Sequence, residues 1–282
     1  MREERIMNKM IFANTLRFCN KVDKLKNAIT IARNQQYVVK DEEKLNIDSK
    51  PYYKAKVNIV VSKERSFEAA RKYEKQRVCV LNFASSLNPG GGVENGSNAQ
   101  EESLCRCSTL YMDLYDKKML NQFYNIHRKA VRSNAMNYLY SDDLIFTPNV
   151  IVFKTDEEQP RLIKQEYWYD VDVITCAAPN LKKGFEKENK KTKEIINNWE
   201  LKKIIVKRTK KILSIAKKER EDIVILGAFG CGAFRNPPWI VAEAMKEAIK
   251  EFEYDFKTIE FAIYCPTNNT LNYDVFKEVF GV

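Results

Sequence analysis

The chain has 282 residues, of which 44% are hydrophobic and 30% are charged, and its formal net charge is +10. This balance predicts a soluble globular protein with one large domain or two small ones. Histidine occurs once, at His127, which excludes every metal centre that needs two histidines. No stretch approaches the roughly 20 apolar residues of a membrane-spanning helix, so we expect no membrane partner.

The seven cysteines are scattered along the chain, and their odd number does not favour a disulfide framework. Cys105 and Cys107 form a C-x-C pair, but no second pair lies at zinc-ribbon spacing, so we expect neither a metal nor another cofactor. Residues 1–10 are charged and show no apolar signal segment. We therefore expect reduced thiols in an intracellular, cytoplasmic protein, or a nuclear one if its source is eukaryotic.

Residues 1–50 are polar and mainly helical in pattern, and we interpret them as an N-terminal helical extension of a domain spanning residues 51–282. In that domain, apolar β-rich runs alternate with amphipathic helical runs. The expected strands are Lys56–Val61, Val78–Phe83, Val150–Phe153, Val171–Cys176, Asp222–Leu226 and Thr258–Tyr264. The expected helices are Ser66–Lys75 with Ser66 as its N-cap, one ending near Tyr115, one within residues 181–220, and one from Asn236 to about Phe252.

This alternation predicts an α/β fold with three layers, in which helices cover both faces of a mostly parallel or mixed sheet. Ligands bind such sheets beyond the carboxyl ends of the strands. Function is therefore expected in the loops that follow the strands.

Positive charge is concentrated in residues 181–220, which hold 15 Lys and Arg and 5 Glu, whereas the remainder of the chain has 33 charges of each sign. Such a segment favours a polyanionic partner. Apolar residues recur there at helical spacing, so a solvated helix face explains the lysines equally well. Aromatic residues are sparse in the segment, so nucleic-acid binding is not expected.

Glycine is scarce, and seven of the nine glycines fall into two clusters, each following an expected strand. The first cluster is Gly90, Gly91, Gly92 and Gly96, and the second is Gly227, Gly230 and Gly232. Glycine permits positive φ angles and close approach of the backbone to a ligand. Because both clusters follow strand ends, we expect the two loops to converge on one crevice.

The first loop continues into Gln100-Glu101-Glu102, which opens an apolar helical pattern. Its three consecutive glycines would let backbone amides approach an oxygen-rich ligand. Acidic residues in a first helical turn also interact favourably with the helix dipole, so the two glutamates taken alone do not establish catalysis.

The second loop, Gly227-Ala228-Phe229-Gly230-Cys231-Gly232-Ala233-Phe234, joins an expected strand to an expected helix. Such a turn is a common phosphate cradle, because free amides lie there at a positive helix end. The loop lacks the G-K-[ST] ending of a Walker A motif and the spacing of the dinucleotide fingerprint. A tight turn without a ligand is the alternative.

His127 lies in a mixed polar and apolar stretch with no pattern that marks it as a base. We interpret it as a structural or surface histidine, although any Ser–His–Asp or Cys–His mechanism would have to use it.

The two loops together resemble the bacterial-type poly(ADP-ribose) glycohydrolases of the macrodomain superfamily. The resemblance rests on N-F-A-S, N-P-G-G-G and Q-E-E-S-L-C-R in the first loop and on G-A-F-G-C-G-A-F-R-N-P-P downstream. It covers roughly residues 55–280. It implies a macrodomain, in which a mixed central sheet flanked by helices binds ADP-ribose in a crevice at the strand ends.

The resemblance also implies roles for individual residues. Glu102 would be the catalytic acid that protonates the leaving ribose hydroxyl, and Glu101 would hold the sugar hydroxyls near the scissile bond. The implied substrate-binding residues are Asn82, Gly90, Gly91 and Gly92 near the distal ribose, and Gly230, Cys231, Gly232, Ala233 and Phe234 around the diphosphate, with Phe234 also packing on the distal ribose. Gln100 is a further expected substrate-binding residue. For adenine, residues 61–67 are only a candidate segment.

The expected reaction is cleavage of the ribose–ribose O-glycosidic bond to release ADP-ribose, without a metal. Adjacent glutamates on a helix point about 100° apart, so one catalytic and one positioning carboxyl is a better assignment than a facing pair. Two alternatives stay open, a non-catalytic reader of ADP-ribose and a hydrolase that removes mono-ADP-ribose from proteins. The glutamate pair counts against the reader. The expected substrates are poly(ADP-ribose) or ADP-ribosylated proteins, and we expect a monomer.

Overall fold

The computed structural model describes residues 2–182, 196–266 and 269–282. The strands are β1 (Tyr37–Val39), β2 (Asn58–Ser62), β3 (Val78–Phe83), β4 (Leu144–Val152), β5 (Tyr169–Cys176), β6 (Ile223–Leu226) and β7 (Thr258–Ala262). The α-helices are α1 (Arg2–Lys21), α2 (Asp23–Gln35), α3 (Ser66–Arg71), α4 (Gln100–Cys107), α5 (Leu110–Leu114), α6 (Lys117–Met119), α7 (Asn125–Arg132), α9 (Asn198–Lys218), α10 (Pro238–Ile249) and α11 (Leu271–Phe280).

The strands form one mixed sheet in the order β1-β4-β5-β3-β6-β7-β2. From β5 to β2 all neighbouring strands are parallel, while β4 is antiparallel to both β5 and β1. This confirms the predicted α/β fold with a mixed central sheet.

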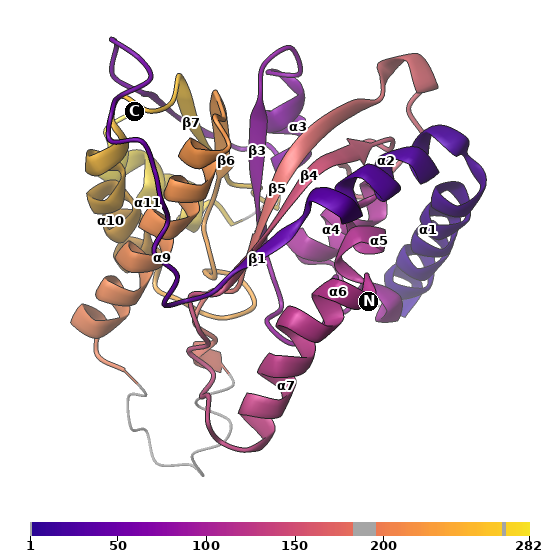
Figure 1. Ribbon diagram of the computed structural model, residues 1–282, viewed down its shortest axis with the longest axis horizontal. Helices are drawn as coiled ribbons and strands as arrows, with labels where there is room; N and C mark the ends of the chain where they lie inside the picture. Colours follow the sequence, from indigo (N-terminus) through magenta and orange to yellow (C-terminus); the bar gives the residue numbers. More distant parts are fainter. Residues whose placement is uncertain (1, 183–195, 267–268) are drawn as a thin grey trace.

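Helices cover both faces of the sheet because side chains alternate between its faces along each strand. On β3, Leu81 packs in a core with α9, α10 and α11, whereas Val80 packs on the opposite face with α3, α4 and α5. Figure 1 shows the two helical layers on either side of the sheet; α2 packs directly on β4 in the second layer, and α1 packs against α2 and α4. Three layers result, as the strand and helix pattern predicts.

The parallel strands end at one edge of the sheet. Phe83 pairs with Cys176, Leu226 with Phe261, and Ser62 with Ala262, so β3, β5, β6, β7 and β2 all finish at the same level. The loops that follow these strands therefore meet, as parallel α/β sheets require. Both glycine clusters belong to this set of loops.

The N-terminal residues contain the expected helices, but they also supply a strand. Tyr37–Val39 pairs antiparallel with Leu144–Phe146 and forms one edge of the sheet. Three residues give too short a run for the alternation of a strand to show in the sequence. The boundary after residue 50 stays a prediction, and β1 places part of the segment before it in the same sheet as the residues after it.

Two local predictions are wrong. The helix expected to continue to Tyr115 breaks at Ser108, which is extended and forms a β-bridge with Val152. Ser66 is not the N-cap of α3, because it is the first residue of the helix, and its hydroxyl instead accepts a hydrogen bond from Gln100. The N-cap of α3 is Arg65, whose N–H donates to Glu68.

In the described part of the chain, none of the helices combines the length and the apolar character needed to cross a bilayer.

Candidate active site

The first glycine loop leaves β3 at Phe83 and returns to the sheet as α4. Gly90 and Gly91 have φ angles of +68° and +62°, which side-chain-bearing residues rarely adopt. A β-carbon on Gly91 would lie 2.6 Å from Oε1 of Glu102 and 2.9 Å from Oε2 of Glu101. Only glycine therefore allows the backbone to approach both carboxyl groups at this point.

Glu101 is buried beneath the loop. The N–H of Ser85 donates to its Oε2 (2.7 Å), and Nδ2 of Asn82 donates to its Oε1 (3.4 Å). Burial, and then the neighbouring Glu102, raise the pKa of Glu101 well above its usual value. The carboxyl group is thus fixed in place between the loop and the end of β3.

Glu102 is held by the backbone at both ends of the loop. The N–H of Gly92 donates to Oε1 (2.8 Å), and the N–H of Ala99, which precedes the first turn of α4, donates to Oε2 (3.1 Å). The second bond is the reciprocal half of a capping box, in which a glutamate at the third helical position reaches back to the N-cap amide. Glu102 is 7% exposed, so its position is well defined and nearly shielded from water.

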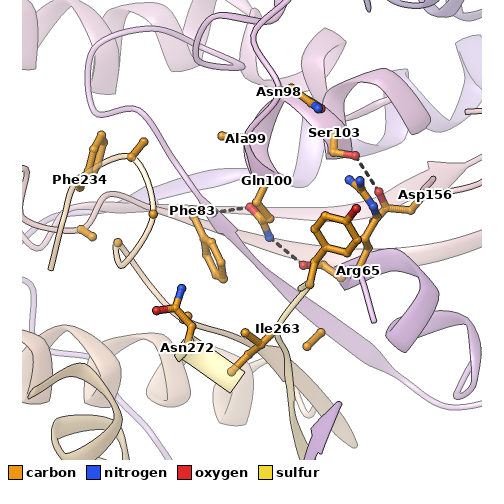
Figure 2. A pocket seen from close by; sticks show the side chains of 18 residues that line it. Arg65, Phe83, Asn98, Ala99, Gln100, Ser103, Asp156, Phe234, Ile263 and Asn272 are labelled. Carbon is orange, nitrogen blue, oxygen red and sulfur yellow. Dashed lines mark hydrogen bonds between the residues drawn. The ribbon is translucent and has the colours of Figure 1, made fainter. Parts of the chain in front are cut away.

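Gln100 joins three elements. The N–H of Phe83 donates to its Oε1 (2.9 Å), and its Nε2 donates to the carbonyl of Leu81 (2.8 Å) and to the hydroxyl of Ser66 (3.0 Å). Figure 2 shows Gln100 in the centre of the cavity wall, with its bonds to Phe83 and Ser66 linking β3, α3 and α4. Its amide group is thus engaged within the protein.

Asn82, near the end of β3, donates from Nδ2 to Glu101 and to the hydroxyl of Thr175 (3.2 Å). Its Oδ1 is buried and has no hydrogen-bond partner among the described residues. A buried acceptor without a donor is costly, and a sugar hydroxyl can supply one.

The second glycine loop is braced by a residue that the sequence analysis assigns only to the start of a helix. Nδ2 of Asn236 donates to the carbonyls of Pro179 (2.8 Å) and Gly230 (3.0 Å). Gly230 has a φ of +76°, and a β-carbon there would lie 2.3 Å from that Nδ2 and 2.5 Å from Cβ of Ala178. No local pattern could reveal this role, because Pro179 reaches Asn236 only through the fold.

The same loop presents unused backbone donors. In residues 2–182, 196–266 and 269–282, no acceptor is found for the N–H groups of Gly232, Ala233 and Phe234. These three residues line a cavity of about 480 Å³. Consecutive free amides around a cavity form a site suited to an anion such as a diphosphate.

The cavity runs between the two loops. Its lining residues are Arg65, Ser66, Phe83, Asn98, Ala99, Gln100, Ser103, Asp156, Ala178, Ala228, Gly230, Gly232, Ala233, Phe234, Ala262, Ile263, Tyr264 and Asn272. In Figure 2, Phe234 lies at one end, and Arg65 and Asp156 lie at the other. The two ends are therefore chemically different, with free amides at one and charged side chains at the other.

The predicted site residues divide between the cavity and its surroundings. Five of the predicted substrate-binding residues line it, namely Gln100, Gly230, Gly232, Ala233 and Phe234. The remaining members of the predicted set are not among the lining residues: Asn82, Gly90, Gly91, Gly92, Cys231, Glu101 and Glu102. Glu102 adjoins the cavity through Ala99, because Ala99 lines the cavity and its N–H donates to Oε2 of Glu102.

Sequence reasoning missed the residues at the far end of the cavity, apart from Arg65 and Ser66, which belong to the candidate adenine segment. Asp156 accepts hydrogen bonds from the hydroxyl of Ser103 (2.7 Å) and the N–H of Phe67 (3.1 Å). Burial raises its pKa. Asp156 follows β4 in an irregular segment, and its approach to α3 and α4 is a product of the fold.

His127 is structural. Its Nδ1 lies 2.8 Å from Oγ of Ser86, and its Nε2 lies 3.0 Å from Oδ2 of Asp143. All three residues are buried, and none of them lines the cavity between the glycine loops. The histidine links α7 to the first glycine loop and to the start of β4.

Residues 183–195 of the predicted basic segment lie outside the described residues, and α9 forms most of the remainder. Four of its lysines form ion pairs with acidic side chains of other elements. These lysines are Lys202, Lys207, Lys210 and Lys217. Arg208 is buried and pairs with Asp142. Much of the positive charge of α9 is thus neutralised within the protein, which favours the helix-face interpretation.

The catalytic-domain model of the microbial-type poly(ADP-ribose) glycohydrolases (PARG) matches residues 12–155. The chain belongs to this family. It is therefore a glycosidase that hydrolyses poly(ADP-ribose), with an α/β, macrodomain-like fold.

Solved PARG structures resemble the whole chain. PARG from Thermomonospora curvata has a TM-score of 0.82 and 27% identity, over 97% of this chain and 99% of that one. The same enzyme bound to the inhibitor ADP-HPD has a TM-score of 0.78 and 27% identity, over 96% and 98%. PARG from Deinococcus radiodurans in complex with ADP-ribose has a TM-score of 0.77 and 27% identity, over 90% and 97%. A search of curated proteins found no match.

Proposed function

We propose that Glu102 is the general acid and base of the glycosidic cleavage. The observation that carries this assignment is the position of its carboxyl group, fixed between the N–H groups of Gly92 and Ala99 beside the cavity. Protonated Glu102 gives its proton to the leaving oxygen as the bond from that oxygen to the distal ribose breaks. The resulting carboxylate then takes a proton from the water that attacks the ribose carbon.

Glu101 and Asn82 position the distal ribose in this proposal. Glu101 is held by the amide of Ser85, and the Oδ1 of Asn82 is free to accept a bond from a sugar hydroxyl. Because the two glutamates are neighbours on α4, they do not face each other across the bond as the carboxyl pair of many glycosidases does. The predicted division into one catalytic and one positioning carboxyl is compatible with their different surroundings.

The second loop would bind the diphosphate. Support comes from the free N–H groups of Gly232, Ala233 and Phe234, which line the cavity, and from the bracing of Gly230 by Asn236. A diphosphate held by fixed amides carries negative charge close to the ribose, where it would stabilise an oxocarbenium-like transition state. Adenine would occupy the other end of the cavity, beside Arg65 and Ser66.

The substrate would be the terminal unit of poly(ADP-ribose), and the product free ADP-ribose. We also propose an intracellular monomer. All seven cysteines are free thiols in the structure, as expected in a reducing compartment. Size-exclusion chromatography with light scattering measures the monomer directly.

Glu102→Gln tests the central assignment. The variant should release ADP-ribose from the polymer about 10²–10⁴-fold more slowly, because a general acid–base group contributes that range. Its affinity for ADP-ribose, measured by calorimetry, should stay within about threefold, since an amide of the same shape keeps the pocket.

Glu157→Gln is the matched control, because the Glu157 side chain is 39% exposed and pairs only with Arg161 in the described part of the chain. Polymer hydrolysis by Glu102→Gln at the wild-type rate would refute the assignment. Testing a mono-ADP-ribosylated protein beside the polymer separates the two hydrolase alternatives, and wild-type binding without turnover on either substrate would identify a reader.

A further inference from the structure

One segment of the chain, between Asp116 and Asp142, carries positive charge and contains no acidic residue. Residues 117–141 contain five Lys and Arg residues and no Asp or Glu: Lys117, Lys118, Arg128, Lys129 and Arg132. None of these five forms an ion pair with the described residues. The contrast with α9, whose lysines pair with acids on neighbouring elements, is sharp. Lys118 and Arg128 donate hydrogen bonds to uncharged oxygen atoms of the protein, so no described carboxylate pairs with the charge of these five side chains.

Three of these cations gather on α7. Arg128, Lys129 and Arg132 line an open surface hollow together with Asn125 and Ser133. Lys129 and Arg132 are exposed, and no aromatic or acidic side chain lines the hollow. We call these three cations and the hollow between them the α7 basic face. Its chemistry fits phosphate groups, which guanidinium and ammonium groups bind as charge-assisted hydrogen-bond donors.

The α7 basic face is joined to the first glycine loop. Nε of Arg128 donates to the carbonyl of Leu87 (2.7 Å), and its NH2 group donates to Oδ1 of Asn88 (3.4 Å). The carbonyl of Asn88 in turn accepts a bond from the N–H of Gly91 (2.9 Å), the glycine that touches both glutamates. The α7 basic face is thus connected, through Arg128 and Asn88, to the loop that contacts the two glutamates.

Its place relative to the sheet agrees with these contacts. The loop after β3 runs toward α7, which extends away from the sheet at the lower end of the molecule in Figure 1. The cavity that would hold the terminal ADP-ribose extends from Ala99, whose N–H binds Glu102, toward Phe234 and Arg65, and no residue of α7 lines it. A polymer cleaved at Glu102 has to leave the site on the side away from that cavity.

We propose that the α7 basic face binds the diphosphate of the ADP-ribose unit next to the scissile bond, on the part of the polymer that remains after cleavage. This inference rests on the proposed function. Each such unit carries two negative charges, and the polymer emerging beside Glu102 brings them toward Arg128, Lys129 and Arg132. The α7 basic face therefore distinguishes polymer from a lone terminal ADP-ribose.

The charge reversal Lys129→Glu with Arg132→Glu tests the inference. It leaves Arg128, which contacts the first glycine loop, in place. We expect KM for long poly(ADP-ribose) to rise about tenfold at low salt and less at high salt, because phosphate contacts are salt-dependent. The value of kcat and the Kd for free ADP-ribose, measured by calorimetry, should change by less than about twofold, since neither involves the next unit.

The matched control is Lys75→Glu with Lys250→Glu, which makes the same change in net charge. Both lysines are exposed. Lys75 precedes the start of β3, and Lys250 follows α10 at the end remote from the second glycine loop, so both lie at the opposite end of the sheet. An effect confined to the α7 variant supports a local phosphate site, and an equal effect of both variants overturns it in favour of net charge.

Two further outcomes separate the possible failures. An unchanged KM for polymer in the α7 variant, while wild type and variant hydrolyse it normally, overturns the inference and leaves the proposed function intact. Loss of binding to a single-stranded RNA with unchanged KM for polymer assigns the α7 basic face to nucleic acid instead. If the wild-type chain fails to cleave polymer, the proposed function itself falls, and Glu102→Gln then shows no further loss.

Discussion

The backbone conformation of Gly91 determines how closely the first glycine loop approaches the two glutamates. Its positive φ and its missing β-carbon together bring the loop within contact of Glu101 and Glu102. Ser85 fixes the first of these carboxyl groups, and Gly92 fixes the second. The first glycine loop therefore sets the position of both carboxyl groups.

Gly91→Ala should lower kcat on poly(ADP-ribose) by about 10²-fold or more, because a displacement of about 1 Å at a catalytic group has effects of that size. The new β-carbon would lie 2.6 Å from Glu102 and would displace it. Steady-state kinetics on the polymer measure the change.

The control is Gly281→Ala, which has a comparable φ of +72° but open space around its β-carbon. That variant isolates the cost of the left-handed conformation, roughly 1–2 kcal/mol. Equal kcat values for Gly91→Ala and wild type would show that the loop does not position the glutamates.

At the residue scale, the glycines and the glutamate pair could be predicted because glycine is scarce elsewhere and clusters after strands. The partners that fix them could not. The backbone N–H of Ser85 donates to the Glu101 side chain, and the Asn236 side chain donates to the backbone carbonyl of Pro179; only the folded chain brings these groups together. The pattern around Asn236 indicates no more than a helix start. Side-chain to backbone bonds of this kind leave no periodic signal in a sequence.

At the scale of elements, α1 supports the part of the first glycine loop around Gly96. A β-carbon on Gly96 would lie 2.2 Å from the backbone oxygen of Arg5, and Nδ2 of Asn8 donates to the carbonyl of Gly96 (3.3 Å). Arg106 of α4 is almost fully buried and donates to the carbonyl of Ser97 (2.6 Å). The segment between Gly92 and α4 is thus enclosed by two helices.

Helix α1 is anchored by the same region. The hydroxyl of Thr15 donates to the carbonyl of Arg106 (2.5 Å), and Nζ of Lys154 donates to Thr15 (2.7 Å) and to the carbonyl of Ile11 (3.0 Å). Burial lowers the pKa of Lys154 from 10.5 to about 8. The sequence predicts a helix here, but a helical pattern does not identify the surface against which the helix packs, and so Gly96 has no predicted contact.

Gly96→Ala should lower the free energy of unfolding by about 2–4 kcal/mol, the sum of the left-handed backbone cost and of overpacking against α1. Urea denaturation measures it. Gly281→Ala again measures only the loss of unfolding free energy caused by the left-handed backbone, because nothing lies within 4 Å of its β-carbon. Identical losses in the two variants would contradict a tight contact between α1 and the loop.

At the scale of the whole molecule, Asp143 ties together segments that are distant along the chain. It accepts bonds from His127 (3.0 Å), from Nζ of Lys40 (3.2 Å) and from the N–H of Asp41 (2.7 Å). Burial opposes ionisation of Asp143, but the bond from His127 and the Lys40 ammonium outweigh it and lower its pKa from 3.8 to about 2.

Because this pKa is lower in the folded state, ionised Asp143 stabilises the protein above about pH 4 and loses that contribution as the pH falls toward about 2. The difference in unfolding free energy between wild type and Asp143→Asn should therefore narrow over that interval. Chemical denaturation at several pH values measures it. Asp48→Asn, at an exposed position, should show no such narrowing. A constant difference for Asp143→Asn would contradict the assigned pKa.

The layers and the positions of most strands could be predicted from alternation alone, since buried parallel strands are short apolar runs. Strand β3 matches its predicted bounds, Val78–Phe83. The strand order and the edge position of β1 could not be predicted, because pairing depends on segments far apart in the chain. The ion pairs could not be predicted from the sequence either. Acidic side chains neutralise much of the charge of α9 but none of the charge of Arg128, Lys129 and Arg132 on α7 in the described part of the chain.

The strand order also determines when the crevice can exist during synthesis. Asn58 of β2 pairs with Thr258 of β7, two hundred residues later, and Tyr37 of β1 pairs with Phe146 of β4. As the chain leaves the ribosome from its N-terminus, both edge strands emerge long before their partners. The loops after β2 and β7 form one wall of the cavity, so a nascent chain cannot bind ADP-ribose there until β7 has been made.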